Sequence, residues 1–172
     1  MKKCGIILML TFTLCFTGCA AAVNDGTELL EKKEYEAAIE EFSEAIKEDK
    51  NVAEAYRGQG IAYWELGKYK EAKQALEKAL DNGAEETAVL YQIMGDSDMQ
   101  TGDYESALSN YWKGMSCQGA TEQQIQEMSY NEIAAYEYLS DWSTAKAKMN
   151  AYIEKYPDDE KAVKEAQFLE TR

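Results

Sequence analysis

One short motif recurs along this chain and limits the folds open to it. The stretch Gly67–Ala72 (GKYKEA) reappears 35 residues later as Gly102–Ala107 (GDYESA). Two related stretches, KEYEAA around Tyr35 and SDWSTA around Trp142, extend the series at spacings of 34 and 38 residues. A self-similar period near 34 residues is typical of helix–turn–helix units that stack into a solenoid.

Each copy continues into an apolar stripe with helical spacing. Apolar or small residues follow at i, i+4, i+7 and i+8, which places them on one face of a helix. Gly67 and Gly102 precede these helices, and glycine can end a helix in the left-handed conformation without a Cβ penalty. We therefore expect each copy to be a helix hairpin with the glycine in its turn. The four stripes are Ala38, Phe42, Ala45 and Ile46; Ala72, Leu76, Ala79 and Leu80; Ala107, Tyr111, Gly114 and Met115; and Ala145, Met149, Tyr152 and Ile153.

Local signals predict where several helices begin and end. The stretch Thr121–Gln124 (TEQQ) has the form of a capping box, with a hydroxyl followed three residues later by Gln. Asp103 and Asp141 stand at the expected N-caps of two second helices. Pro157 should end the last hairpin, and the helical spacing after it predicts a helix over residues 158–171 that covers the open end. Nine helices are expected in all.

These copies resemble the tetratricopeptide repeat (TPR) family, and the resemblance covers nearly all of residues 24–157. It implies an all-α fold, a right-handed α-solenoid of about four hairpins plus the C-terminal capping helix. The expected TPR domain is 27–172, with repeats at about 19–52, 53–86, 88–121 and 126–159. Gly60 and Gly95 are expected to face Ala72 and Ala107, and Asp98 departs from the pattern where a Tyr is usual. The second copy carries the fullest match, with Tyr56, Gly60, Tyr63, Gly67, Tyr69, Ala72, Leu76 and Ala79.

The first eighteen residues differ from the rest and predict a signal peptide. A basic start is followed by the apolar run Gly5–Phe16, which is too short for a permanent membrane span of roughly 20 residues. The sequence FTGC at its end resembles a bacterial lipobox. That resemblance implies a signal peptide over 1–18, diacylglyceryl attachment to Cys19, and a lipidated tether over 19–26. The alternative is an ordinary signal peptide in which Cys19 stays an unmodified thiol.

Charge bears on where such a protein could bind. The chain has a net charge of −14, and its first eighteen residues contain two of the 18 basic side chains and none of the 32 acidic ones. From Cys19 onward the net charge is therefore −16, which repels nucleic acid and anionic headgroups. We expect no nucleic-acid partner, and we expect the lipid on Cys19 to hold the protein at the extracytoplasmic face of a bacterial cell membrane.

Few residues here suit catalysis or cofactor binding. The chain contains no His. Of its four Cys residues, Cys4 and Cys15 leave with the signal peptide and Cys19 carries the lipid, so only Cys117 remains and neither a disulfide nor a cysteine-based metal site is expected. Paired acids such as Asp158 and Asp159 could serve glycan cleavage, but acid-rich helix faces are usually solvated. We therefore expect that the protein is not an enzyme and that it binds no metal and no cofactor.

The TPR resemblance also implies a binding surface, because the first helix of each hairpin lines a concave groove. Its aromatic, apolar and amide side chains favour a peptide or protein segment as the guest. Trp64 and Tyr138 could instead merely pack between neighbouring units. The residues expected to line this protein-binding groove are Arg57, Ile61, Trp64, Gln92, Asp96, Met99, Tyr130, Asn131 and Tyr138, with Glu127 and Glu137 nearby.

The charge of this expected surface indicates the kind of partner. TPR domains that grip acidic tails use Lys, Arg and Asn, whereas only Arg57 and Asn131 stand in matching positions here, opposed by Asp96 and Glu137. A basic or neutral partner is expected rather than an acidic one. The expected function is a lipid-anchored extracytoplasmic scaffold or adaptor. Two alternatives remain open at this point: a cell-wall glycan-binding module that uses groove aromatics, and a self-associating structural lipoprotein.

Overall fold

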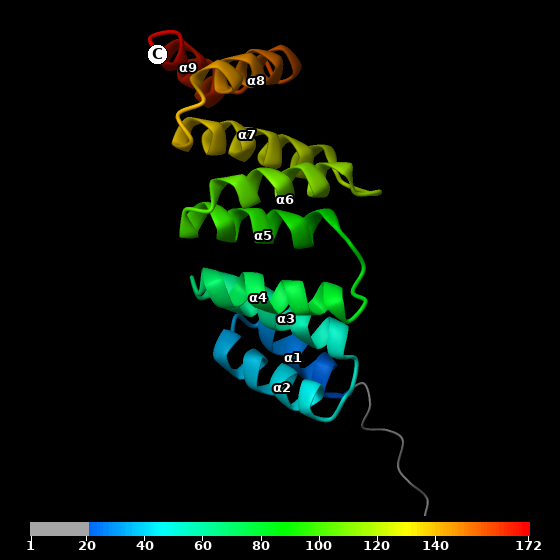
Figure 1. Cartoon of the computed structure of the whole chain (residues 1–172). Coiled ribbons are helices and arrows are strands. Elements are labelled where there is room, and N and C mark those ends of the chain that lie inside the picture. Colours follow the sequence, from blue (N-terminus) through cyan, green and yellow to red (C-terminus); the bar gives the residue numbers. More distant parts are fainter. Residues whose placement is uncertain (1–20) are drawn as a thin grey trace, which may run out of the picture.

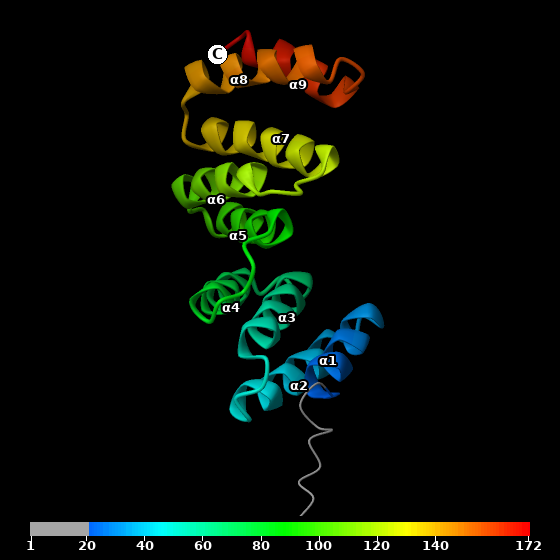
Figure 2. The same cartoon turned by 90° about the vertical axis from the view of Figure 1, so that its right-hand side faces the viewer.

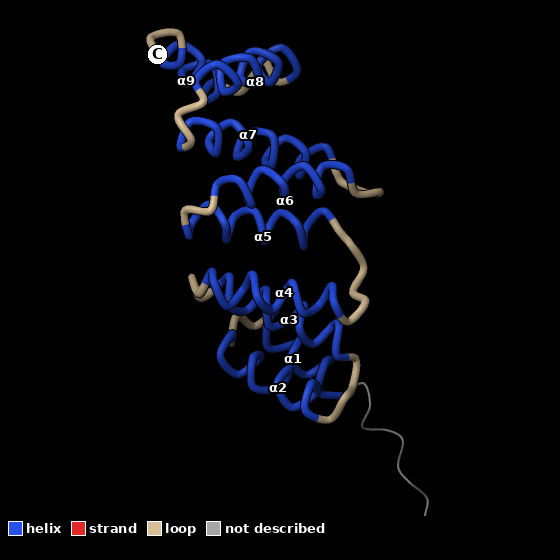
Figure 3. Tube along the Cα trace, in the orientation of Figure 1, coloured by secondary structure: helices blue, strands red, loops and turns tan. Residues whose placement is uncertain are grey.

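The computed structural model describes residues 21–172, which form nine α-helices joined by short turns (Figure 3). The predicted signal peptide and Cys19 lie outside the described residues. The helices are α1 (Ala21–Glu31), α2 (Tyr35–Lys47), α3 (Val52–Glu65), α4 (Tyr69–Asp81), α5 (Ala88–Thr101), α6 (Tyr104–Ser116), α7 (Glu122–Tyr138), α8 (Trp142–Lys155) and α9 (Glu160–Leu169).

The helices pair into hairpins that stack in series. The pairs are α1/α2, α3/α4, α5/α6 and α7/α8, and α9 packs on α8 at the C-terminal end of the stack (Figures 1 and 2). The first helices also contact one another, α1 with α3, α3 with α5 and α5 with α7. They therefore form one continuous wall of the molecule. The predicted all-α architecture of stacked hairpins is confirmed.

The apolar stripes form the core, as their spacing predicted. In each of α2, α4, α6 and α8, the first three stripe positions are buried against the neighbouring helices. Removing these side chains from water stabilises the stack by about 25 cal/mol per Å² of apolar surface. The buried residues are Ala38, Phe42 and Ala45; Ala72, Leu76 and Ala79; Ala107, Tyr111 and Gly114; and Ala145, Met149 and Tyr152.

The turn and cap predictions are also confirmed. Gly67 and Gly102 have φ values of +70° and +80°, the left-handed conformation that ends a helix. Thr121 forms the complete capping box with Gln124 at the start of α7. The Asp103 carboxylate accepts a hydrogen bond from the Ser106 backbone N–H at 3.3 Å, and Asp141 accepts one from Thr144 at 3.2 Å.

The helical glycines make closer contacts than the sequence pattern suggested. A Cβ at Gly60 would lie 2.5 Å from the Leu76 side chain, closer than the 3.3 Å to the Ala72 carbonyl oxygen. At Gly95 the nearest atoms belong to the Tyr111 ring, also at 2.5 Å. Gly60 thus faces Ala72 as expected but lies closer still to Leu76, and the nearest contacts of Gly95 come from Tyr111, one turn beyond the expected Ala107. The glycines make room for the large residue of each stripe, because that residue must enter the space between two helices.

Both ends of the stack differ from expectation. Residues 21–26, assigned to a tether, are instead the first turns of α1. Ala22 and Val23 pack against the buried cluster around Phe42, and a Cβ at Gly26 would lie 2.7 Å from the Phe42 ring. Packing of Ala22, Val23 and Gly26 on this cluster favours a helix here over an extended tether. At the other end α9 begins at Glu160, two residues later than the predicted 158.

Candidate binding groove

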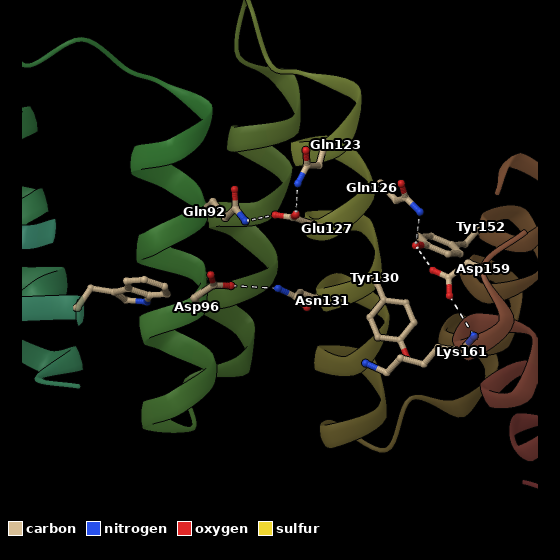
Figure 4. Close-up of a pocket in the computed structure, with 11 residues that line it drawn as sticks. Gln92, Asp96, Gln123, Gln126, Glu127, Tyr130, Asn131, Tyr152, Asp159 and Lys161 are labelled. Carbon is tan, nitrogen blue, oxygen red and sulfur yellow. Dashed lines mark hydrogen bonds between the residues drawn. The ribbon is translucent and has the colours of Figure 1, made fainter. Parts of the chain in front are cut away.

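A groove of about 630 Å³ runs along the wall of first helices toward the C-terminal end. It is lined by α3, α5 and α7, by Tyr152 of α8, and by the start of α9, as Figure 4 shows for most of its side chains. A second hollow of about 260 Å³ adjoins it and shares Trp64, Asp96 and Asn131. The lining residues of the larger groove are Trp64, Gln92, Asp96, Gln123, Gln126, Glu127, Tyr130, Asn131, Tyr152, Asp159 and Lys161.

Most of the residues predicted to form a binding surface come together here. Five of them line the larger groove: Trp64, Gln92, Asp96, Tyr130 and Asn131. Met99 lines the adjoining hollow, next to Trp64. Trp64 also packs against the buried cluster around Leu76 and Tyr91, so it serves the core and the groove at once.

Three predicted residues lie elsewhere. Arg57 forms an ion pair with Glu54 one turn away on α3. Ile61 packs against the core cluster of the second and third hairpins. Tyr138 is 64% exposed and stacks on Tyr104 with the ring centroids 4.7 Å apart. Because Tyr104 belongs to the preceding hairpin, Tyr138 packs between units, which was the alternative interpretation of this residue.

Hydrogen bonds to Asp96 fix the part of the groove between α5 and α7. Its Oδ1 accepts from the Tyr111 hydroxyl at 2.8 Å and from Asn131 Nδ2 at 3.1 Å. Burial raises the pKa of the Asp96 carboxyl, although these two hydrogen bonds partly oppose the shift. The network joins α5, α6 and α7, so it holds the third and fourth hairpins in register around the groove.

One side of the groove carries a row of amide side chains. Gln92 Nε2 and Gln123 Nε2 each donate to Glu127 at 2.9 Å, and these bonds lower the pKa of the Glu127 carboxyl. Gln126 Nε2 donates to the Tyr152 hydroxyl at 3.1 Å. Each of these amide nitrogens uses one of its two N–H groups in these bonds, while the carboxamide oxygens of the three Gln residues accept no hydrogen bond within residues 21–172. This side therefore offers acceptors to a guest.

The C-terminal end of the groove is built by α8 and α9. The Tyr152 hydroxyl donates to Asp159 at 2.8 Å, and burial together with this acid raises the pKa of Tyr152 to about 12. Asp159 also caps α9 by accepting from the backbone N–H groups of Lys161 and Ala162 at 3.1 Å. The Lys161 side chain then reaches back across the groove toward Tyr130 (Figure 4).

Several lining residues lie outside the groove positions that the repeat pattern predicts. Tyr152, Asp159 and Lys161 belong to a second helix and the capping segment, whereas the repeat pattern places groove positions on first helices only. Gln123 and Gln126 precede the first of those positions in the fourth copy. Asp159 offered one usable signal, because an acid three residues before Ala162 at a helix start is a candidate N-cap.

Residues 21–172 lack the features of two other kinds of site. No helix in this range is both long and apolar enough to cross a bilayer. Nor do three or more Cys, Asp or Glu side chains there gather in an arrangement that could hold a metal ion.

Sequence comparison decides the family. Tetratricopeptide repeat patterns match residues 24–87 and residues 130–159, which together are more than half of the chain. The chain belongs to the tetratricopeptide repeat family. The first match covers the first two hairpins, and the second runs from the middle of α7 through α8 to Asp159, so TPR patterns match both ends of the stack.

Curated relatives match about half of the chain or less. The chain is 33% identical over 87 residues to TPR repeat-containing protein YsoA of Bacillus subtilis (strain 168), which is 51% of this chain but 26% of YsoA. It is 27% identical over 73 residues to Sperm-associated antigen 1 of Rattus norvegicus, 42% of this chain and 8% of that protein. The chain thus matches about a quarter or less of either relative.

Solved structures share the fold over most of the chain. The crystal structure of YrrB, described as a TPR protein with an unusual peptide-binding site, superposes with a TM-score of 0.74 and 24% identity. That superposition covers 86% of this chain and 74% of YrrB. The MamA crystal structure gives a TM-score of 0.73 at 18% identity, covering 86% of this chain and 78% of MamA. At these identities the similarity shows the fold.

Proposed function

We propose that this TPR protein is a lipid-anchored extracytoplasmic scaffold that holds an extended segment of a partner protein in the groove beside Trp64 and Tyr130. The observation that carries the proposal is the acceptor-rich row of Gln side chains facing an aromatic floor. An extended polypeptide supplies regularly spaced backbone N–H donors to such a row. YrrB, a TPR protein of the same fold, has a peptide-binding site, which is consistent with this use of the fold.

Charge favours a basic or neutral segment over an acidic one. The groove contains Asp96, Glu127 and Asp159 against the single cation Lys161. The two residues in positions like those of an acidic-tail clamp are already engaged, since Arg57 pairs with Glu54 and Asn131 donates to Asp96. An acidic tail would meet net repulsion here.

The membrane part of the proposal rests on sequence. FTGC at residues 16–19 resembles a lipobox, and a diacylglyceryl group on Cys19 would anchor an acidic domain that electrostatics alone would repel from anionic lipid. Because α1 begins at Ala21, the first hairpin would lie directly at the bilayer, with the groove toward the far end of the stack.

Site-specific photocrosslinking tests the proposal. The full chain, produced in a bacterial envelope, would carry a photoreactive amino acid in place of Trp64 or Gln126. Trp112 is the matched control, because it is 65% exposed and lines neither hollow. We expect one dominant protein partner from both groove positions and none from Trp112. Recovery of glycan alone would replace the proposal with a glycan-binding module, and recovery of the chain itself alone would replace it with self-association.

A further inference from the structure

The cation nearest the aromatic floor of the groove belongs to the protein itself. Lys161 Nζ lies 4.7 Å from the centroid of the Tyr130 ring, and its side chain crosses from the start of α9 to reach it (Figure 4). An ammonium group at this separation is attracted by the negative face of the ring. The ring is held for such contact, since Tyr130 is half-buried and packs edge-on against Tyr152 with centroids 5.7 Å apart.

Negative charge around this ring exceeds what one lysine can balance. Burial raises the pKa of the Tyr130 hydroxyl, and the nearby charges of Glu165, Glu137 and Asp159 raise it further. Asp159 is engaged by Tyr152 and by the α9 backbone. Neither Glu137 nor Glu165 forms a hydrogen bond or ion pair within residues 21–172. Burial and the charge of Glu165 together raise the pKa of Glu137. The site therefore attracts further positive charge.

Lys161 is held there only loosely. Its side chain is exposed, and its ammonium group lies within 4.0 Å of no carboxylate in the described part of the chain, so its charge acts on Asp159 only from a longer distance. A solvent-exposed cation–π contact is a weak interaction. Another cation that brings additional contacts along the groove can therefore displace Lys161 from the ring, and the long, flexible lysine can swing into water.

We propose that the Tyr130 face is the subsite for a lysine or arginine side chain of the bound partner segment, and that Lys161 is its resident occupant in the free protein. This inference rests on the proposed function, since it requires a polypeptide in the groove. It adds the chemistry of one partner residue. That residue is cationic, and the partner's backbone N–H groups beside it donate to the carboxamide oxygens of Gln92, Gln123 and Gln126. Lys161 acts on this account as an internal competitor that sets a threshold for binding.

The direction in which one substitution changes peptide affinity tests this proposal. Labelled peptide pools, degenerate in neutral residues but with a fixed central Lys, Arg, Gln or Glu, would be titrated against the full chain by fluorescence anisotropy. We expect Lys161→Gln to tighten binding of the Lys and Arg pools by about 3- to 10-fold, as removal of a competing cation–π contact implies. The affinity for the Gln and Glu pools should not rise. Lys164→Gln, an exposed lysine of the same helix, is the matched control and should change no affinity.

A second variant tests the ring. Tyr130→Leu keeps apolar packing but removes the aromatic face, so we expect the Lys and Arg pools to lose most of their advantage over the Gln pool, keeping only the attraction of the nearby carboxylates. If Lys161→Gln weakens the Glu pool and leaves the Lys pool unchanged, Lys161 is instead an anchor for an acidic partner and the inference is wrong. Binding of all pools with no dependence on either variant also overturns it, while leaving groove binding intact. If no pool binds the wild-type protein or any of the variants, the proposed function is overturned as well.

Discussion

Asp98 is the residue at which this chain departs most clearly from its own repeat pattern. It stands where the family usually has Tyr, and it is fully buried. Its carboxylate accepts from Lys73 Nζ at 2.5 Å and from Asn110 Nδ2 at 2.8 Å. These partners lie on α4 and α6, so one carboxylate links the second hairpin to the third. A buried charge is tolerated because both of its oxygens are satisfied.

Removing this carboxylate should be costly. We expect Asp98→Ala to lower the free energy of unfolding by about 3 kcal/mol, because the buried Asn110 amide and Lys73 lose their acceptor. Urea unfolding followed by circular dichroism measures the change. The control Glu54→Ala breaks the partly exposed ion pair with Arg57 and should cost less than about 1 kcal/mol. Equal losses in the two variants would show that Asp98 does not link the hairpins as described.

At the scale of elements, α9 depends on one of two adjacent acids. Asp159 accepts backbone hydrogen bonds from Lys161 and Ala162, whereas the Asp158 side chain makes none within residues 21–172. We expect Asp159→Ala to lower the free energy of unfolding by about 1 kcal/mol through loss of the cap. Asp158→Ala removes the same charge and should leave the free energy of unfolding nearly unchanged. Thermal or urea unfolding of the pair separates capping from net charge.

The effect of Asp159 should depend on pH in a defined direction. Hydrogen bonds from the Ala162 backbone N–H and the Tyr152 hydroxyl lower its pKa below the ordinary value of 3.8. A carboxyl with a lowered folded-state pKa stabilises the protein above its unfolded pKa and loses that contribution as the pH falls through the folded value. The difference between wild type and Asp159→Ala should therefore be full at pH 7 and shrink below 3.8. A difference that grows with acid would contradict this assignment.

The elements also show what sequence could and could not predict. Hairpins, turns and most caps follow from local rules, since Gly67, Gly102 and Thr121 act on residues within one turn. The groove depends on contacts between repeats, such as that of Gln92 with Glu127 across 35 positions. Such pairs depend on how far each hairpin rotates on its neighbour, which the repeat pattern does not encode. The start of α1 could not be predicted because it depends on the contact of Ala22, Val23 and Gly26 with the cluster around Phe42.

At the scale of the whole molecule, the acidic stack and its proposed anchor have opposite preferences for a membrane surface. With a net charge of −16 from Cys19 onward, the domain gains nothing from anionic headgroups. We expect Cys19→Ser to move the protein from the membrane fraction to the soluble fraction, because the acyl chains supply the binding energy. Cys117→Ser alters the other cysteine of the mature region and should leave the protein in the membrane fraction. Retention of Cys19→Ser in membranes would contradict lipid anchoring.

The central claim concerns the groove, and a crystal structure of the full chain with the tightest-binding lysine-containing peptide tests it most directly. We predict an extended peptide along the wall of first helices, between Trp64 and Tyr130. Its lysine should lie on the Tyr130 ring, with Lys161 displaced. A peptide bound near Trp112 on α6, or at the Phe168 end of the stack, would contradict the account.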